Sequence, residues 1–235
     1  MNRNSNTYTI IYSAVLVIVV GVVLSVVYQA LRPKQLENIN NDTRRQILAA
    51  ARIVPAKGEK IDPSQNAFDV NVATESKKDA SERLLPVYEC KTDNGMKYII
   101  PVYGAGLWGP IWGYVAFDDN GDTIYGAYFA HQGETPGLGA EIEKPKFRDQ
   151  FDGKNIFSAQ GEFTSVAVSK IGKEPQGQAW VHAVSGGTIT SQGVQKMLFD
   201  SLEPYTAFLK GLKGNESAAT ASTETTASES KATES

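Results

Sequence analysis

Val184-Ser185-Gly186-Gly187-Thr188-Ile189-Thr190-Ser191 is the stretch of sequence around which the rest of the chain can be ordered. Its two glycines allow a tight backbone turn and the close approach of another group. The stretch also carries four hydroxyl side chains, those of Ser185, Thr188, Thr190 and Ser191. Apolar residues at spacings of three and four follow at once and predict an amphipathic helix; they are Val194, Leu198, Leu202, Tyr205 and Leu209.

We expect this helix to begin near Gln192 and to kink or restart at Pro204. The hydroxyl cluster then lies at, or just before, a helix N-terminus, where free N–H groups and the positive dipole end attract phosphate. A phosphate held at Thr188 would find backbone and hydroxyl donors. The same residues also fit an ordinary Ser/Thr N-cap after a glycine-rich turn. The residue pattern alone leaves both interpretations open.

Composition limits the classes of function. The chain has 235 residues and a formal net charge of -3, which gives no reason to expect nucleic acid as a partner. Its single cysteine, Cys90, excludes an intrachain disulfide framework and a multi-cysteine metal site. With two histidines in all, we predict no metal site. Without the two ends of the chain, about 180 residues remain for one well-buried domain or two small lobes.

The N-terminal end predicts a membrane anchor. A short polar segment, residues 1–7, precedes a run without charged side chains that extends to Leu31. Roughly 20 apolar residues suffice to span a bilayer as a helix, and we place a retained transmembrane helix at residues 8–31. A cleaved signal peptide is the alternative, but its apolar region is shorter and ends in a small-residue cleavage site. By the positive-inside rule, the basic residues from Arg32 to Arg52 would place the large domain in the cytoplasm.

The remainder divides into three regions. Residues 32–85 are predicted to be a membrane-proximal region, with a helix or solvated stalk from Leu36 to Val54 and a polar, solvated segment that includes Lys77 and Lys78. Residues 86–213 form the main domain. Residues 214–235, rich in Ser, Thr, Ala and Glu, are predicted to be a disordered tail.

Strand patterns begin at Pro86. We predict strand, turn and strand around Asp93-Asn94-Gly95, a hairpin turn at 118–122, a strand from Thr123 to Ala130, a short helix at 145–151 and a strand at 161–171. The segment 103–113 alternates glycines with large aromatics. It either approaches a flat ligand or partner, or it is a bulged strand with Trp108 and Trp112 in the core.

A second loop, from His131 to Gly139, contains a Pro-Gly turn and several small residues. Such a loop is expected to lie against another group. His131 and Glu134 either brace the loop by hydrogen bonds or form a catalytic pair. We prefer bracing and assign no catalytic residue.

Together these motifs resemble the FMN-binding domain family. Its flavinylation motif is usually Asp-x-x-Ser-Gly-Ala-Thr-x-Ser/Thr, and its loop reads His-x-Glu-Thr-Pro-Gly-Leu-Gly. The resemblance implies an α+β domain of mixed sheets and helices in which FMN is joined to Thr188 through a phosphoester. The other cofactor-binding residues that it implies are Ser185, Gly186, Gly187, Thr190, Ser191, Glu134, Thr135, Gly137, Leu138, Gly139, Leu107 and Trp108. Two positions depart from the motif: Gly187 replaces Ala, and His182 replaces the Asp that helps the modifying flavin transferase recognise its site.

Within this family, the segment Tyr103-Gly-Ala-Gly-Leu-Trp108 resembles the C subunits of the sodium-translocating NADH:quinone oxidoreductases. This resemblance implies a membrane-anchored electron carrier with covalent FMN in a complex where NADH is oxidised on another subunit. It also implies an extracytoplasmic domain at the cytoplasmic membrane, opposite to the charge rule, with other redox subunits and a flavin transferase as partners. Two alternatives are the G subunit of an Rnf-type electron-transport complex and a membrane-tethered binding module without flavin.

Overall fold

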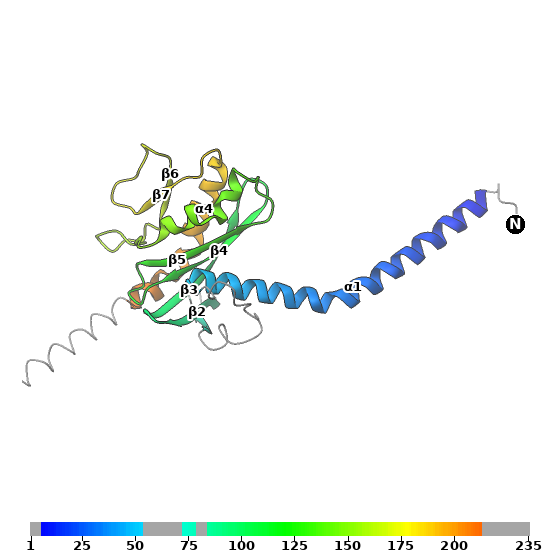
Figure 1. The fold of residues 1–235 in the computed structure, drawn as a ribbon, viewed down its shortest axis with the longest axis horizontal. Helices are drawn as coiled ribbons and strands as arrows, with labels where there is room; N and C mark the ends of the chain where they lie inside the picture. Colours follow the sequence, from blue (N-terminus) through cyan, green and yellow to red (C-terminus); the bar gives the residue numbers. More distant parts are fainter. Residues whose placement is uncertain (1–5, 54–71, 79–83, 213–235) are drawn as a thin grey trace, which may run out of the picture. The chain divides into compact units, whose positions relative to one another are not determined.

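The computed structural model describes residues 6–53, 72–78 and 84–212 (Figure 1). The chain divides into two compact units, Met1–Thr43 and Arg44–Ser235, which we describe separately. The predicted disordered tail at 214–235 lies outside the described residues.

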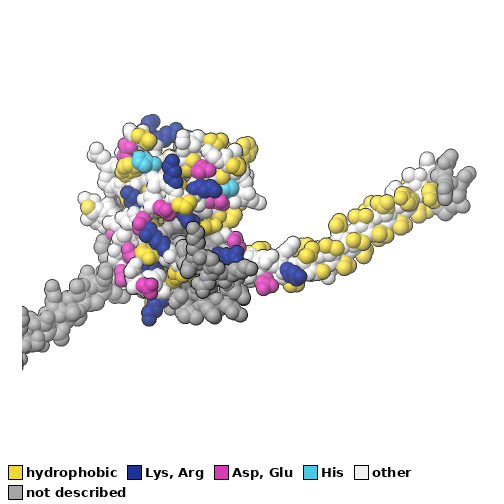
Figure 2. Space-filling view, viewed as in Figure 1, with side chains coloured by type: hydrophobic (Ala, Val, Ile, Leu, Met, Phe, Trp, Pro, Cys, Tyr) yellow, Lys and Arg dark blue, Asp and Glu magenta, His cyan; other side chains and the backbone are white. Residues whose placement is uncertain are grey.

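Helix α1 (Asn6–Ala50) provides the first unit and enters the second. It is long and apolar enough to cross a membrane, and Figure 2 shows the apolar side chains along it. The helix predicted from Leu36 onward is confirmed to Ala50, but it is continuous with the apolar run. Pro33 lies inside α1 without ending it.

The second unit is built on a five-stranded antiparallel sheet with the strands in chain order. The predicted strand, turn and strand at 93–95 are confirmed as β2 (Leu84–Thr92) and β3 (Gly95–Ala105). β4 (Pro110–Phe117) and β5 (Ile124–His131) follow, and the hairpin turn between them is confirmed by the bond from the Asp118 N–H to the Thr123 carbonyl.

β1 (Val72–Lys78) corrects the prediction for the polar segment before Pro86. This segment pairs antiparallel with β2 instead of forming only a solvated face, and the Lys77 ammonium lies 3.4 Å from the Glu89 carboxylate across the pair. The backbone edge of β2 offers hydrogen-bond partners to any neighbouring segment. A polar sequence gives no sign of such pairing, which explains why the pattern did not predict this strand.

Both faces of the sheet are covered. On one face the predicted apolar stripe of α4 (Thr188–Leu202), including Val194 and Leu198, is fully buried with residues such as Ile100 and Phe129. On the other face Ile47 and Leu48 at the end of α1 pack near Cys90. Burial raises the pKa of the Cys90 thiol to about 11, so Cys90 behaves as a small hydrophobic residue.

The rest of the chain forms short elements. After β5 come η1 (Gly139–Glu143), α3 (Pro145–Arg148) and η2 (Asp149–Phe151), which confirm the short helix predicted at 145–151. β6 (Ala167–Ser169) pairs in parallel with β7 (Trp180–His182). The predicted strand at 161–171 is therefore too long, because Ser165 has φ +58° and interrupts the extended backbone. α4 stops before Pro204, where η3 (Glu203–Tyr205) intervenes, and helix resumes at 206–212 as predicted.

Replacing Gly113 by Ala should destabilise the sheet. A Cβ at this position would collide with the Tyr128 carbonyl oxygen on β5 and lie 2.8 Å from the Phe129 ring. Gly113→Ala should lower the free energy of unfolding by about 1–3 kcal/mol, the usual cost of overpacking. Gly133→Ala is the matched control, because the nearest atom to its added Cβ is 4.0 Å away. Urea unfolding followed by tryptophan fluorescence measures both, and equal stability of the two variants would contradict the packing argument.

Candidate functional site

The start of α4 is the centre of the site. Gly186, with φ +73°, completes the turn, and Gly187 is the N-cap residue, so that Thr188 is the first helical residue. The helix therefore begins one turn earlier than the predicted start near Gln192. The Ser191 N–H already donates to the Gly187 carbonyl at 2.9 Å. The Ser191 hydroxyl accepts the Val184 N–H at 3.0 Å. This bond holds the glycine turn before α4 against the first turn of the helix.

The four hydroxyls of this stretch have different environments. Thr190 and Ser191 are buried, and Thr190 donates its hydroxyl hydrogen to a Glu134 carboxylate oxygen. Both residues were predicted to contact the cofactor, and in the structure their hydroxyls make internal hydrogen bonds. Thr188 is half-buried and Ser185 is exposed. The N-cap glycine has no side chain to cap α4, so the first N–H groups of the helix are available beside Thr188.

Glu134 joins the loop of residues 131–139 to the two other motifs. Its side chain is only 4% exposed. One carboxylate oxygen accepts the Trp108 N–H at 2.9 Å, and the other accepts the Thr190 hydroxyl. Burial alone would raise the pKa of this carboxyl. The hydrogen bonds from Thr190 and from the Trp108 and Leu107 backbone outweigh burial, and the pKa of Glu134 lies below its ordinary value.

His131 braces the same loop. Its Nδ1 accepts the Glu134 N–H at 3.2 Å. The His131 backbone N–H donates to the Glu143 carboxylate at 3.3 Å. The Pro-Gly turn is closed by a 3.1 Å bond from the Leu138 N–H to the Thr135 carbonyl. These contacts are those of the bracing role that we preferred for His131 and Glu134.

Glycines let the three motifs touch. A Cβ at Gly186 would lie 2.5 Å from a Leu138 methyl carbon, so the loop and the turn before α4 are in direct contact. A Cβ at Gly187 would lie 3.3 Å from the Gly139 Cα. The 104–109 segment is held from the other side, because a Cβ at Gly193 on α4 would collide with the Ala105 carbonyl. The segments predicted separately therefore form one site.

Large apolar side chains are exposed around this site. Trp108 is 68% exposed and does not lie in the core. Of the two interpretations of the 103–113 segment, the one that buries Trp108 in the core is therefore wrong. Trp112 is half-buried and donates its ring N–H to the Gln46 amide oxygen at 3.2 Å. Leu107, Leu138 and Ile189 are also exposed. Ile189 was not predicted, although its place beside Thr188 in the first turn of α4 could have suggested it.

The arrangement fits a planar ligand with a phosphate. The N-terminus of α4 supplies backbone donors for the phosphate, and glycines leave room beside it. The exposed apolar side chains offer contacts to a flat ring. His182, at the position of the family Asp, is exposed at the end of β7, and its backbone N–H donates to the Gln150 amide oxygen at 2.9 Å.

Comparison with known proteins agrees with this chemistry. Residues 106–203 match the family model of the FMN-binding domain, which confirms the predicted cofactor. The C subunit of the Na(+)-translocating NADH-quinone reductase of Yersinia pestis is 31% identical over 234 residues, 83% of this chain and 87% of the relative. The corresponding protein of Chlamydia caviae is 41% identical over 121 residues, and that match spans 46% of this chain and 38% of the relative.

A solved structure extends the comparison to the fold. The crystal structure of the C subunit of the Na(+)-translocating NADH-quinone reductase from Parabacteroides distasonis has 44% sequence identity and a TM-score of 0.62. The likeness covers 76% of this chain and 96% of that chain. The predicted α+β fold with an N-terminal apolar helix and an FMN-binding domain is thus confirmed.

Removing the Glu134 carboxylate should loosen the site. Glu134→Ala removes the acceptor of the part-buried Trp108 N–H and of the buried Thr190 hydroxyl, and the buried hydroxyl left without an acceptor costs about 1–3 kcal/mol. Glu134→Gln should cost less, because the amide keeps one acceptor oxygen. The exposed acid Glu203, changed to Gln, is the control.

The pH dependence gives an independent check. Because the folded pKa of Glu134 is lower than the ordinary value of 4.5, its charge adds stability above that pH, and this stability is lost as pH falls through the folded pKa. The stability gap between the native protein and Glu134→Gln should shrink on acidification in urea-unfolding measurements. A gap that stays constant would show that the charge contributes nothing.

Proposed function

We propose that this chain is a membrane-anchored electron carrier with FMN covalently attached to Thr188. It belongs to the family of C subunits of the Na(+)-translocating NADH-quinone reductases. It would pass electrons between other subunits of such a complex. The observation that carries the proposal is the position of Thr188 as the half-buried first residue of a helix with a glycine N-cap, directly after Gly187, whose added Cβ would lie 3.3 Å from the Gly139 Cα of the loop.

Hydrogen bonding explains the choice of Thr188 among the four hydroxyls. Thr190 is engaged by Glu134, and Ser191 is buried and engaged by the Val184 N–H. Ser185 lies outside the helix and lacks its N–H groups. A phosphate on the Thr188 oxygen would instead lie beside the first N–H groups of α4, which stabilise an anion by roughly 0.3–1 kcal/mol at an exposed site.

The remaining residues orient the flavin and set its exposure. FMN supplies the redox chemistry, since a flavin accepts one electron or two. Leu138 on the braced loop lies beside Gly186, Thr135 on the same loop is exposed, and Trp108 adds a second apolar surface. Leu138 and Trp108 are exposed to solvent instead of packing into the core. They are therefore available to contact the ring and to limit its access to water.

Maturation and location complete the proposal. A flavin transferase forms the phosphoester, and it must tolerate His182, which is exposed and accessible to such an enzyme. Residues 8–31 of α1 span the cytoplasmic membrane once. The flavin domain lies outside the cytoplasm, next to partner redox subunits. If His182 prevents modification, a membrane-tethered binding module without flavin becomes the better hypothesis.

Mass spectrometry of the intact protein tests the attachment. The chain expressed with its transferase should gain the mass of one FMN less one water, on the peptide that contains Thr188. Thr188→Val should abolish the adduct, because the attachment oxygen is removed. Thr190→Ser, which keeps the hydroxyl for Glu134, should retain it. An adduct on Ser185 or Ser191 would overturn the assignment, and no adduct at all would favour the module without flavin.

Protease accessibility tests the orientation. Trypsin added to intact spheroplasts should digest the domain after α1, since we place it outside the cytoplasmic membrane. A cytoplasmic protein probed in the same sample should stay intact as the control. If the domain is protected until the membrane is broken, the basic residues after the anchor have determined the topology and our orientation is wrong.

A further inference from the structure

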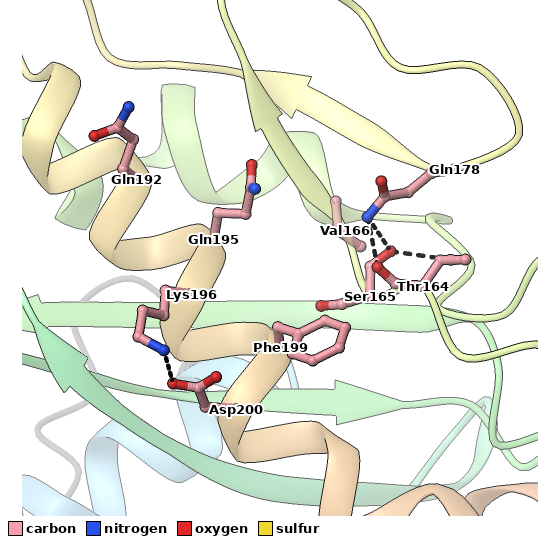
Figure 3. A pocket seen from close by; sticks show the side chains of 9 residues that line it. All are labelled: Thr164, Ser165, Val166, Gln178, Gln192, Gln195, Lys196, Phe199 and Asp200. Carbon is pink, nitrogen blue, oxygen red and sulfur yellow. Dashed lines mark hydrogen bonds and ion pairs between the residues drawn. The ribbon is translucent and has the colours of Figure 1, made fainter.

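A cleft lies apart from the contacts just described. Between α4 and the segments around residues 165 and 178 is a cleft of about 400 Å³, within the range of about 300–1,000 Å³ typical of small-molecule sites. Figure 3 shows the side chains that line it. They are Thr164, Ser165, Val166, Gln178, Gln192, Gln195, Lys196, Phe199 and Asp200.

Ser165 is the unusual residue of this cleft. Its side chain is 2% exposed, and among the described residues its hydroxyl has no hydrogen-bond partner. Its φ of +58° is a strained conformation for a residue other than glycine. The backbone is held there by a 3.0 Å bond from the Ser165 N–H to the Ile156 carbonyl. A buried polar group without a partner is costly, and a ligand in the cleft would supply the missing bond.

The neighbouring amides add donors and an acceptor. The Gln195 oxygen accepts the Val168 N–H at 2.9 Å, which leaves the amide hydrogens of Gln195 for a ligand. Gln178 has the opposite arrangement, because its nitrogen donates to the carbonyls of Thr164 and Ser165 and its oxygen remains an acceptor. Lys196 is paired with Asp200 at 2.7 Å, so the cleft carries no net charge from these two.

These groups match the edge of a neutral planar ring. An imide edge presents one N–H between two carbonyl oxygens, so it needs one acceptor and two donors. Gln178 offers the acceptor, and Ser165 and Gln195 offer donors. Phe199, which is 40% exposed, offers an aromatic surface to the ring. The isoalloxazine ring of a flavin has such an edge and such a surface.

The helix geometry connects the cleft to Thr188. Residues 188, 192, 195 and 199 are spaced by four, three and four, which places them on one face of α4. At 1.5 Å per residue, Gln195 lies about 10 Å along the helix from Thr188. A phosphate and a five-carbon ribityl chain separate the ring of FMN from its attachment oxygen, and they are of comparable length when extended.

We propose that the cleft beside Ser165 receives the isoalloxazine ring of the flavin attached at Thr188, as a second position in addition to the one beside Leu138 and Trp108. This inference rests on the proposed attachment of FMN. A free flavin presents the same imide edge and is the other source of such a ligand, so the experiment must distinguish a tethered ring from a free one.

NMR of the full-length chain in detergent makes this distinction. In protein shown by mass spectrometry to carry FMN, the side-chain amide signals of Gln178 and Gln195 should differ from those of the unmodified Thr188→Val variant. The amide of Gln160, which does not line the cleft, should not change. Unchanged Gln178 and Gln195 signals in the modified protein would overturn the inference and leave the proposed function intact.

The Ser165→Ala variant separates binding from a structural role. The hydroxyl has no partner to lose among the described residues, so this change should not lower the thermal stability. It should nevertheless reduce the population of the ring in the cleft about three- to tenfold, the effect of one hydrogen bond, and shrink the amide shifts accordingly. Ser169→Ala, a half-buried serine outside the cleft, is the matched control. Equal amide shifts in the two variants would contradict the role of Ser165.

Addition of free FMN tests whether the ring in the cleft is the tethered one or that of a separate flavin. Millimolar FMN added to unmodified Thr188→Val protein should shift the same two amides, and the modified protein should respond less because the tethered ring competes with free FMN for the cleft. An equal response of both proteins would show that the cleft serves a separate flavin, which overturns our assignment. If Thr188 carries no FMN, the proposed function fails at the mass spectrum, before this measurement.

Discussion

The buried carboxylate of Glu134 is the interaction on which the site depends. It accepts the Trp108 N–H with one oxygen and the Thr190 hydroxyl with the other, so a single residue holds the β3–β4 turn and the first turn of α4 at fixed positions. A buried carboxylate is tolerated only when its oxygens are hydrogen-bonded. The lowered pKa of Glu134 shows that these bonds outweigh the cost of burial. The loop, the β3–β4 turn and the start of α4 are therefore held together by one side chain.

The same carboxylate explains the glycines around it. A Cβ at Gly139 would collide with one Glu134 oxygen, and a Cβ at Gly106 would lie 2.5 Å from the other. Neither position needs glycine for its backbone conformation, because neither has a positive φ. One buried acid thus accounts for a glycine in each of two distant motifs, Gly106 and Gly139. The two glycines do not require a nucleotide-binding loop.

The sequence predicted the regular elements because their patterns are local. The spacing of Val194 and Leu198 identified the helix, and the turn at 93–95 identified the first hairpin. β1 was not predicted because its pairing depends on the backbone of β2 and not on its own side chains. The start of α4 at Thr188 was also not predicted. It depends on hydrogen bonds from Val184 to Ser191 and from Thr190 to Glu134, and the second of these joins residues 56 positions apart.

Two positions for one flavin would have a consequence for electron transfer. The cleft beside Ser165 offers hydrogen-bond donors to the ring carbonyls, whereas Leu138 and Trp108 offer an apolar surface. Reduction adds electron density to the ring, and donors favour the form with more negative charge on the carbonyl oxygens. A site with different affinities for the two redox states shifts the population between positions. The reduced ring would then occupy the cleft for a larger fraction of the time than the oxidised ring does, so each electron transfer would shift the balance between the two positions.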